Sequence, residues 1–255
     1  MINPENLSTD ELYFGDKEFM SVSSWKRFNK CEVSATTEYA IPQSTALMVG
    51  SYVDRFVEGT LDKFKEEHPE IISSRGATKG ELKSEFIQAD EICKYISENK
   101  RLQQFLSGEK QTVMTGEISG VPFKIKIDSY SKGIAINDLK CMRSVTNSNG
   151  EYTDFITPWG YDIQMACYQE IVRQNTGEIL PTFICAVTKE TPINSVIVNI
   201  PQQFLDRSLY LVQSTIEHYY DVKTGKKEAV GCGTCSCCIS KRVDTPIISL
   251  ADLIN

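Results

Sequence analysis

Histidine is scarce in this chain, which has two among its 255 residues, His68 and His218. Neither lies in a motif typical of a nucleophilic enzyme, a zinc protease or a heme protein, so we expect both to be ordinary surface or packed residues. The fingerprints GxGxxG and GxxxxGK[ST] are also missing, which argues against a nucleotide cofactor. No uninterrupted run of about 18 apolar residues occurs, so we expect no membrane-spanning segment.

A secretory signal is missing too, because residues 1–18 are acidic and contain no apolar stretch. The chain nevertheless has nine cysteines. Together these features predict a reducing, cytoplasmic location, where cysteines bind metals or pack as small hydrophobes. The hydrophobic fraction of 41% suits one large domain or a core with appendages. A net charge of −7 is only weak evidence against nucleic acid, since a local basic groove can still bind phosphates.

The first part of the chain, residues 21–110, has apolar residues at helical spacing. Two segments carry the clearest stripes, 51–68 and 77–106, and we expect both stripes to face the core. The period changes to two near Gln111, which predicts strands. We therefore expect a mainly helical N-terminal part over 1–110 of the same domain, a core over 111–222 and a cysteine-rich tail over 223–255.

The core segment alternates strand and helix signals. Alternation over 111–130, a turn at 131–133 and a return strand over 134–140 predict a hairpin. A helix is expected over 157–177, with Thr157 as cap, Pro158 at its first position and Gly177 as its stop. The elements expected after it are strands over 181–189 and 195–200 and a helix over 202–222.

Three charged side chains gather at the ends of the hairpin strands. Asp138 and Lys140 are two apart on one strand, so they face the same side, and Asp128 ends the neighbouring strand. Two carboxylates and the main-chain carbonyl of Leu139 form an oxygen site suited to Mg²⁺ or Mn²⁺. Such an ion can activate water and neutralise charge on a phosphate, while an ammonium orients the water. The pattern therefore fits metal-assisted phosphodiester hydrolysis.

A purely structural reading also exists, in which Asp138 and Lys140 form a salt bridge at a sheet edge. The pattern of an acid two positions before a lysine is common, and three other copies fall in helical or tail segments with no acid at an upstream strand end. We interpret those three as solvated charges: Glu81 with Lys83, Glu98 with Lys100, and Asp221 with Lys223.

From residue 21 to the tail cysteines, the chain resembles the PD-(D/E)XK nuclease superfamily, specifically the exodeoxyribonuclease VIII and RecB-type branch. The motifs that carry the resemblance are VGSYVD, the split acid motif KIKID and NDLK, and QMACY, in that order and spacing. The resemblance implies an α/β restriction-endonuclease-like core with a central mixed β-sheet flanked by helices. It also implies metal ligation by Asp128 and Asp138, a catalytic Lys140, and Gln164 and Tyr168 on one helix face toward the active site or DNA.

Further positions carry over less directly. Glu117 matches an additional acid of relatives, and Asp54 stands where relatives commonly place histidine, which adds negative charge and leaves the metal geometry open. DNA is the implied partner. Three cations near the acids, Lys124, Lys126 and Arg143, would offset the net negative charge where the DNA backbone lies. For Lys124 and Lys126, a solvated strand face is an equally consistent reading.

The tail concentrates cysteines in CGTCSCC, which offers Cys232, Cys235 and either Cys237 or Cys238 as thiolate ligands for zinc or an iron–sulfur cluster. Three ligands are one short of four. Some RecB-type nucleases hold an iron–sulfur cluster with one cysteine before the core and three after it, and Cys31 stands in that position. The resemblance thus implies a set of Cys31, Cys232, Cys235 and Cys238, against the alternative of unligated thiols. The remaining four are expected in the core: Cys93, Cys141, Cys167 and Cys185.

The leading hypothesis is a cytoplasmic Mg²⁺-dependent DNA nuclease. The resemblance implies an exonuclease of prophage or recombination origin, with a single-strand annealing protein or a recombinase as partner. Two rivals stay open, a catalytically inactive nuclease-fold module that binds DNA or assembles with other proteins, and a zinc-binding interaction protein whose hairpin is structural. Cleavage polarity, strand preference and oligomeric state do not follow from the sequence.

Overall fold

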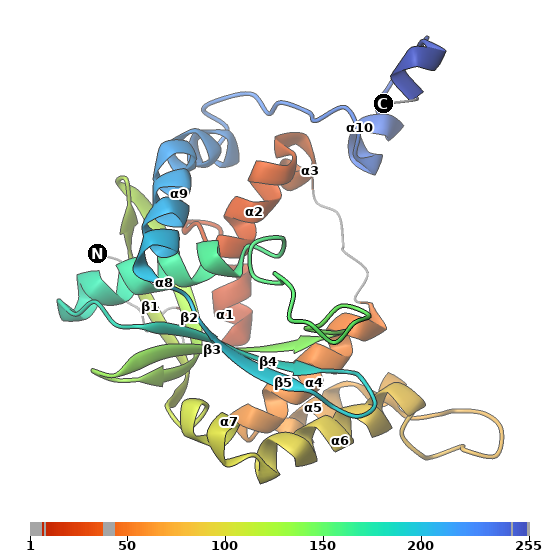
Figure 1. Ribbon diagram of the computed structural model, residues 1–255. Helices are drawn as coiled ribbons and strands as arrows, with labels where there is room; N and C mark the ends of the chain where they lie inside the picture. Colours follow the sequence, from red (N-terminus) through yellow and green to blue (C-terminus); the bar gives the residue numbers. More distant parts are fainter. Residues whose placement is uncertain (1–6, 8, 38–43, 246, 254–255) are drawn as a thin grey trace.

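A five-stranded mixed sheet organises the protein, shown in Figure 1 as a computed structural model that describes residues 7, 9–37, 44–245 and 247–253. The strands lie side by side in chain order: β1 (Glu109–Ile118), β2 (Val121–Ser131), β3 (Ala135–Met142), β4 (Thr182–Thr188) and β5 (Ser195–Asn199). All neighbouring pairs are antiparallel except β3 and β4, which are parallel. A parallel step needs a crossover, and helix α8 (Tyr161–Thr176) supplies it.

Helices surround this sheet and precede most of it in the chain. They are α1 (Asp10–Gly15), α2 (Val22–Lys30), α3 (Glu32–Thr36), α4 (Thr45–Glu58), α5 (Leu61–Glu67), the 3-10 turn η2 (Pro69–Ile71), α6 (Ser84–Glu98), α7 (Lys100–Phe105), α9 (Gln202–Lys223), α10 (Ser236–Ser240) and the 3-10 turn η3 (Leu250–Leu253). The apolar stripe of 51–68 is split between α4 and α5 because Gly59 ends α4 in the left-handed conformation. Residues 77–83 precede α6 and are not helical, contrary to expectation.

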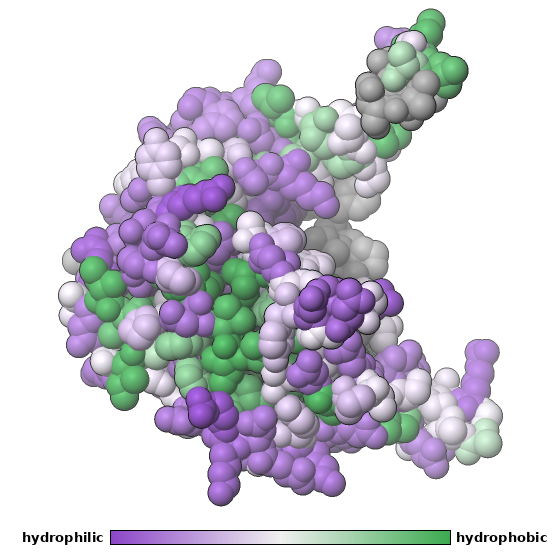
Figure 2. All heavy atoms as spheres, viewed as in Figure 1, coloured by the Kyte–Doolittle hydropathy of each residue, from purple (hydrophilic) through white to green (hydrophobic). Residues whose placement is uncertain are grey.

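Two apolar clusters hold helices to opposite faces of the sheet. One cluster joins strand residues such as Ile125 and Ile184 to α2, α8 and α9. The other joins Leu139 and Val187 to α4 and α6. In the face seen in Figure 2, hydrophobic residues gather over the middle of the molecule, and hydrophilic residues cover most of the surface above and below. This arrangement confirms the expected α/β fold with a mixed sheet between helices.

The helix predicted from Thr157 begins later, at Tyr161. Thr157 instead accepts a hydrogen bond from the Gly160 N–H (3.0 Å) in a turn, so Thr157 is not its cap and Pro158 is not its first residue. Gly160 has φ of 62°, and a Cβ there would lie 2.9 Å from Lys26 Cε. The positive φ therefore favours glycine here, and a larger residue would also displace the end of the flexible Lys26 side chain. Gly177 does end α8, with its N–H bonded to the Arg173 carbonyl at 2.8 Å.

The hairpin of β2 and β3 is short and then opens into a fork. Only the three residue pairs from Ser129–Asn137 to Ser131–Ala135 are in register. The next pair would place Asp128 opposite Asp138, but the ladder stops there. Met20 bonds to β2 at Pro122 and Lys124 beyond this point, and β1 occupies the other edge of β2. The fork thus places two carboxylates where backbone pairing ends.

Candidate active site

Asp138 is the most deeply placed group of the fork, with 1% of its surface exposed. Its Oδ1 accepts a hydrogen bond from Gln164 Nε2 at 2.6 Å, and its Oδ2 forms an ion pair with Lys140. Burial, and then the nearby charge of Asp128, raise the pKa of Asp138 to about 7 in spite of Lys140. The site therefore holds a carboxylate that is costly to ionise without a further cation.

Asp128 lies across the fork from Asp138, and its side chain makes the contact to β3 where the backbone ladder has ended. Its Oδ2 accepts a hydrogen bond from the Leu139 N–H at 3.0 Å, which fixes the carboxylate beside β3. Because a strand residue directs its N–H and C=O to the same side, the Leu139 carbonyl also faces β2. The two acids and the carbonyl named by the sequence are therefore brought together.

Lys140 is a permanent cation in this setting. Burial would lower its pKa, but the carboxylates of Asp138 and Asp128 raise it above its ordinary value. Its Nζ also lies 5.2 Å from the centre of the Tyr161 ring, within range of a cation–π contact. A purely structural reading of the motif also expects an ion pair between Asp138 and Lys140. The burial of this pair, and the nearby carboxylates of Asp128 and Asp54, do not match a solvated sheet edge.

The third carboxylate, Asp54, comes from α4. Ser44 caps this helix through the Leu47 N–H (3.3 Å), and a buried stripe that includes Tyr52 and Val53 packs it on the sheet. Asp54 follows this stripe and lines the same cavity as Asp128. Burial, followed by the charge of Asp128, raises the pKa of Asp54 well above its ordinary value. Aspartate at this position thus adds to the repulsion at the fork.

Gln164 and Tyr168 position the fork from α8. They lie one helical turn apart, and Gln164 Nε2 contacts both Asp138 and the Tyr168 hydroxyl (3.2 Å). The Tyr168 hydroxyl donates to the Lys126 carbonyl at 2.8 Å. Because Gln164 binds Asp138 of β3 and Tyr168 binds Lys126 of β2, this pair ties both arms of the fork to one helix.

Lys26 on α2 also reaches the site, and sequence reasoning missed it. Its Nζ donates to the Trp159 carbonyl at 2.8 Å, and it lines the cavity with Asp54 and Asp128. Burial, and then repulsion by Lys140, lower the pKa of Lys26 to about 8. Its only signal in the sequence is a position beside the buried Trp25, which carries no chemical information.

A cavity of about 430 Å³ opens beside these groups. It is lined by side chains from α1, α2, α4, α5, β1, β2 and α8. The polar and charged ones that bear on the chemistry are Asp10, Lys26, Asp54, Arg55, Lys126, Asp128, Gln164 and Tyr168.

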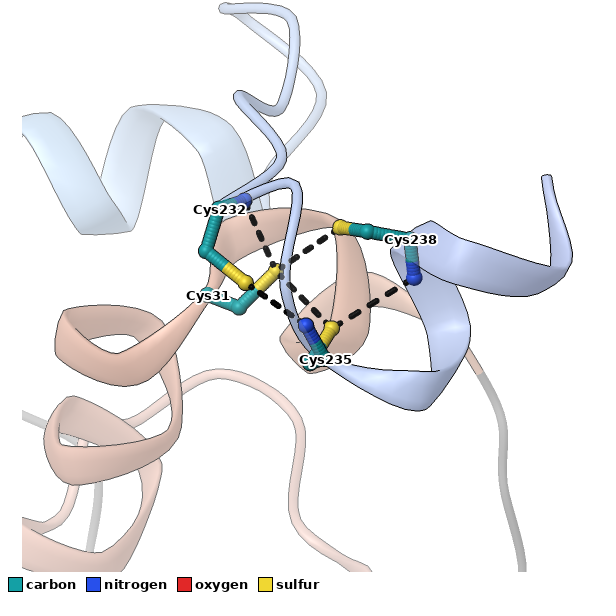
Figure 3. Close-up of side chains that lie close together, drawn as sticks. All are labelled: Cys31, Cys232, Cys235 and Cys238. Atoms are coloured by element: carbon teal, nitrogen blue, oxygen red, sulfur yellow. Dashed lines mark hydrogen bonds between the residues drawn. The ribbon is translucent and has the colours of Figure 1, made fainter. Parts of the chain in front are cut away.

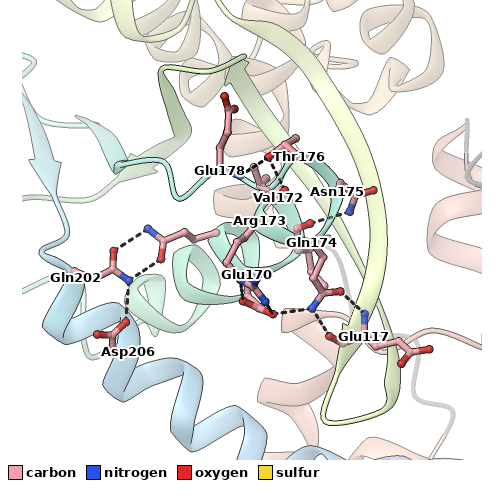
Figure 4. Close-up of polar contacts among 12 residues, drawn as sticks. Glu117, Glu170, Val172, Arg173, Gln174, Asn175, Thr176, Glu178, Gln202 and Asp206 are labelled. Atoms are coloured by element: carbon pink, nitrogen blue, oxygen red, sulfur yellow. Dashed lines mark hydrogen bonds and ion pairs between the residues drawn. The ribbon is translucent and has the colours of Figure 1, made fainter.

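Other predicted positions lie away from the fork. Glu117 is opposite Pro122 at the far end of β1, six positions from Asp128 along the hairpin, or roughly 20 Å. Figure 4 shows its main chain bound to the Gln174 side chain of α8, through its N–H (3.0 Å) and its carbonyl (2.6 Å). Arg143 is exposed in the loop after β3. The structure does not bring either residue to the carboxylates.

The two β2 lysines are not a solvated face. Lys124 is buried, and its Nζ binds the Tyr13 carbonyl and Asp16 Oδ1 (3.1 Å). Lys126 is half-buried and pairs with Asp10 at 2.7 Å. Only Lys126 therefore presents its charge toward the cavity in a form that another anion could compete for.

A second cluster unites Cys31, at the end of α2, with three tail cysteines (Figure 3). The sulfur atoms of Cys31, Cys232, Cys235 and Cys238 all lie within 4.8 Å of one another. Cys238 completes the set, because the Cys237 sulfur turns toward the Thr37 hydroxyl (3.6 Å). Four thiols from segments some 200 residues apart in the chain thus form a possible metal site.

Backbone N–H groups point at these sulfurs. Cys31 receives the N–H of Cys232 at 3.5 Å, and Cys232 receives that of Cys235 at 3.3 Å. Hydrogen bonds from Thr234 lower the pKa of Cys232 to about 5, and the Cys232 N–H lowers that of Cys31. A Cβ on Gly231 would lie 2.9 Å from the Cys238 sulfur. The loop therefore holds the four sulfurs close together. The Cys238 N–H would lower the pKa of Cys235, but desolvation and the neighbouring Cys238 and Cys232 thiols raise it to about 11.

Comparison with known proteins agrees with this geometry. A family model described as "PDDEXK-like domain of unknown function (DUF3799)" matches residues 21–241. The chain belongs to this family. The match places it in the PD-(D/E)XK nuclease-like superfamily, as its motifs suggest, and spans the sheet, the fork and the cysteine set. No curated protein matches the chain.

A solved structure extends the likeness of this PDDEXK-like protein. The crystal structure of a "Putative exonuclease" from Eubacterium rectale is 42% identical in sequence, with a TM-score of 0.85. The alignment covers 100% of this chain and 98% of that chain. Separately, the described part of the chain contains no helix with the length and apolar character needed to cross a membrane.

The raised pKa of Asp138 predicts a specific pH dependence of stability in EDTA. The folded value of about 7 exceeds the ordinary value of 3.8, so this contribution to stability is complete below about pH 4 and is lost as pH rises through 7. Urea denaturation from pH 5 to 8 should show the parent losing on the order of a few kcal/mol, while Asp138→Asn lacks this decline.

Asp221→Asn is the matched control, since the hydrogen bond from Lys227 lowers the pKa of Asp221 and its titration lies below this range. It should follow the parent. Equal pH slopes for the parent and Asp138→Asn would contradict the assigned burial and repulsion at the fork.

Proposed function

We propose that this protein is a Mg²⁺-dependent or Mn²⁺-dependent DNA nuclease that hydrolyses phosphodiester bonds. The observation that supports this most strongly is the fork, where Asp128 and Asp138 oppose each other with Lys140 paired to Asp138. Asp54 and Asp128 line one cavity, and the buried Asp138 interacts with Asp128. Packing these like charges together costs stability, so folding alone does not account for the three carboxylates. A cation that joins them during function accounts for their presence.

The donor set suits such a cation. Asp128, Asp138 and the Leu139 carbonyl offer oxygens alone, the ligands that Mg²⁺ prefers, and Asp54 is a further candidate. Among the described residues, buried Asp138 Oδ2 has the ion pair with Lys140 but no hydrogen bond of normal geometry. When bound, the metal would neutralise phosphate charge and activate water.

The chain's own residues supply position and charge. Lys140 holds an ammonium beside Asp138, where it can orient the attacking water or a phosphate oxygen. Gln164 fixes the rotation of the Asp138 carboxylate, and Tyr168 fixes β2. The proposed catalytic group is therefore Asp128, Asp138 and Lys140, with Gln164 and Tyr168 as positioning residues. Glu117 lies too far away to join them.

An exonuclease is the more specific form of this proposal. It is supported by the description of the 42% identical relative as a "Putative exonuclease". The resemblance to exodeoxyribonuclease VIII supports a role in prophage or recombination metabolism, with a single-strand annealing protein or recombinase as partner. The cysteine content supports a cytoplasmic location. An inactive DNA-binding module is the rival, and it predicts binding without cleavage.

Incubation of purified protein with linear and closed-circular DNA tests this proposal. Linear DNA should be degraded in Mg²⁺ and spared in EDTA, and closed circles should resist. Lys140→Ala should lower the cleavage rate roughly 100-fold or more, because the ammonium that stabilises charge in the transition state is lost. Metal binding should persist.

Lys100→Ala is the control, since it removes an exposed lysine from a copy of the same short motif on α7. It should cut at the parent rate. Survival of several DNA and RNA substrates in both Mg²⁺ and Mn²⁺ would show that the protein is not a nuclease.

The four-cysteine set is proposed to hold a metal staple. Its four sulfurs lie within 4.8 Å of one another, with Cys31 3.6 Å from Cys238 and 3.7 Å from Cys235. A tetrahedral zinc ion with bonds of about 2.3 Å holds its sulfurs about 3.8 Å apart. An iron–sulfur cluster places several atoms between its thiolates and separates them more widely. The spacing therefore favours zinc over a cluster.

Metal analysis and absorption spectra of anaerobically purified protein distinguish these cases. One zinc per chain and no visible absorption are expected, and a combined Cys232→Ser and Cys235→Ser variant should lose the metal and melt at lower temperature. Cys237→Ser, in the adjoining helix α10, should keep the metal. Metal-free parent protein with the same melting temperature as the combined variant would end the staple hypothesis. Visible absorption together with bound iron would show that the cysteines hold an iron–sulfur cluster and not zinc.

A further inference from the structure

The carboxylate of Asp10, the first residue of α1, lies between two cations from other elements. One oxygen contacts Lys126 of β2 at 2.7 Å, and the other contacts Arg55 of α4. Arg55 is also held by Glu58 at 2.8 Å, which fixes its guanidinium toward α1. Two cations thus converge on one oxyanion group.

These cations stand directly beside the proposed catalytic group. Arg55 follows Asp54 on α4, and Lys126 precedes Asp128 by two positions on β2. Residues two apart on a strand are separated by roughly 6.6 Å, comparable to the distance between consecutive phosphates of an extended strand. All four residues line the same cavity. Lys126 therefore lies about one nucleotide away from the fork, and Arg55 meets it at the same Asp10 carboxylate.

A phosphodiester resembles the Asp10 carboxylate that lies between Arg55 and Lys126. It carries one negative charge over two free oxygens, as a carboxylate does, so it can accept the same two charge-assisted contacts. Burial would raise the pKa of Asp10, but hydrogen bonds from Lys126 and Arg55 lower it overall. Asp10 is thus an anion at neutral pH, and its exchange for a phosphodiester leaves the local charge unchanged.

We propose that Arg55 and Lys126 form a subsite for a DNA backbone phosphate adjacent to the scissile one, and that Asp10 fills it in the substrate-free protein. This subsite rests on the proposed nuclease function and deepens it. DNA enters by displacing the carboxylate, and α1 moves aside with it.

Few buried apolar side chains hold α1, which is otherwise attached through the contact of Lys124 with the Tyr13 carbonyl. The helix has six residues, of which only Tyr13 is buried, and Phe14 is 71% exposed. Among the described residues, its buried side chain Tyr13 belongs to a small apolar cluster with Leu7, Phe19 and the partly buried Val113. Elements with few buried apolar contacts open at low free-energy cost.

Lys124, the neighbouring lysine on β2, shows what a purely structural cation looks like here. Its side chain is 6% exposed, and its ammonium is shared between Asp16 and main-chain carbonyls of the same segment. The Lys126 side chain is 16% exposed and Arg55 31%. The pair Lys124–Asp16 therefore provides a matched control for Lys126–Asp10.

Binding measurements without cleavage test the subsite. A fluorescently labelled linear oligodeoxynucleotide is titrated in Mg²⁺ with variants made in an Asp138→Asn background, and anisotropy gives the affinity. Arg55→Gln and Lys126→Gln should each weaken binding several-fold and reduce the slope of log affinity against log salt by about 1. Asp10→Asn should tighten binding several-fold, because the competing anion is gone.

Asp16→Asn removes an acid from the same segment and should leave affinity at the background value. Affinity at the background value in both Arg55→Gln and Lys126→Gln, or no binding by any variant, would overturn the subsite. Cleavage of linear DNA by the parent chain is assayed in parallel. If the parent cuts DNA while these affinities are unchanged, the subsite alone is wrong, whereas failure to cut removes the proposed function as well.

Discussion

Repulsion between carboxylates at the β2–β3 fork is the constraint on which the rest of the site depends. Backbone pairing stops at Ser129 and Asn137, so Asp128 and Asp138 oppose each other without a ladder bond between them. Burial and like charge push the pKa of Asp138 to about 7, and Lys140 compensates only in part. Such an arrangement is unfavourable for the empty protein and favourable for one that binds a divalent cation, because the cation supplies the missing charge.

The surrounding elements hold this unfavourable group in place. The parallel β4 fixes β3, α8 binds both arms through Gln164 and Tyr168, and α4 adds Asp54 from the other face of the sheet. The N-terminal segment does two things. Met20 occupies the edge that β3 leaves open, and α1 places Asp10 on the cations that flank the cavity. A tail held to α2 by four cysteines would fix the position of α2, and with it Lys26, relative to the core.

Much of this could be predicted from the sequence, for physical reasons that differ by element. Period-two alternation gave the strands, and the two-residue spacing of Asp138 and Lys140 guaranteed a shared face. Glu117 has the same chemistry as the other acids, but it lies at the far end of the long β1–β2 hairpin. Position along that hairpin decides which acids come together. The ladder's early end, the burial of Lys124 and the approach of Lys26 depend on packing between distant segments, which single-residue patterns do not record. The αL turn at Gly160 was missed because Thr157 and Pro158 form a plausible helix start of their own.

Calorimetric titration of the metal-free protein with Mg²⁺ or Mn²⁺ tests the central claim most directly. Titrations near pH 6.5 in two buffers of different ionisation enthalpy give the number of protons released on binding. With Asp138 titrating at about 7, the parent should release protons and bind more tightly as pH rises toward 8, since the metal takes the deprotonated carboxylate. Asp138→Asn should bind much more weakly and lose this release. Binding that releases no protons and is equally strong in Asp138→Asn would show that the fork is not a metal site.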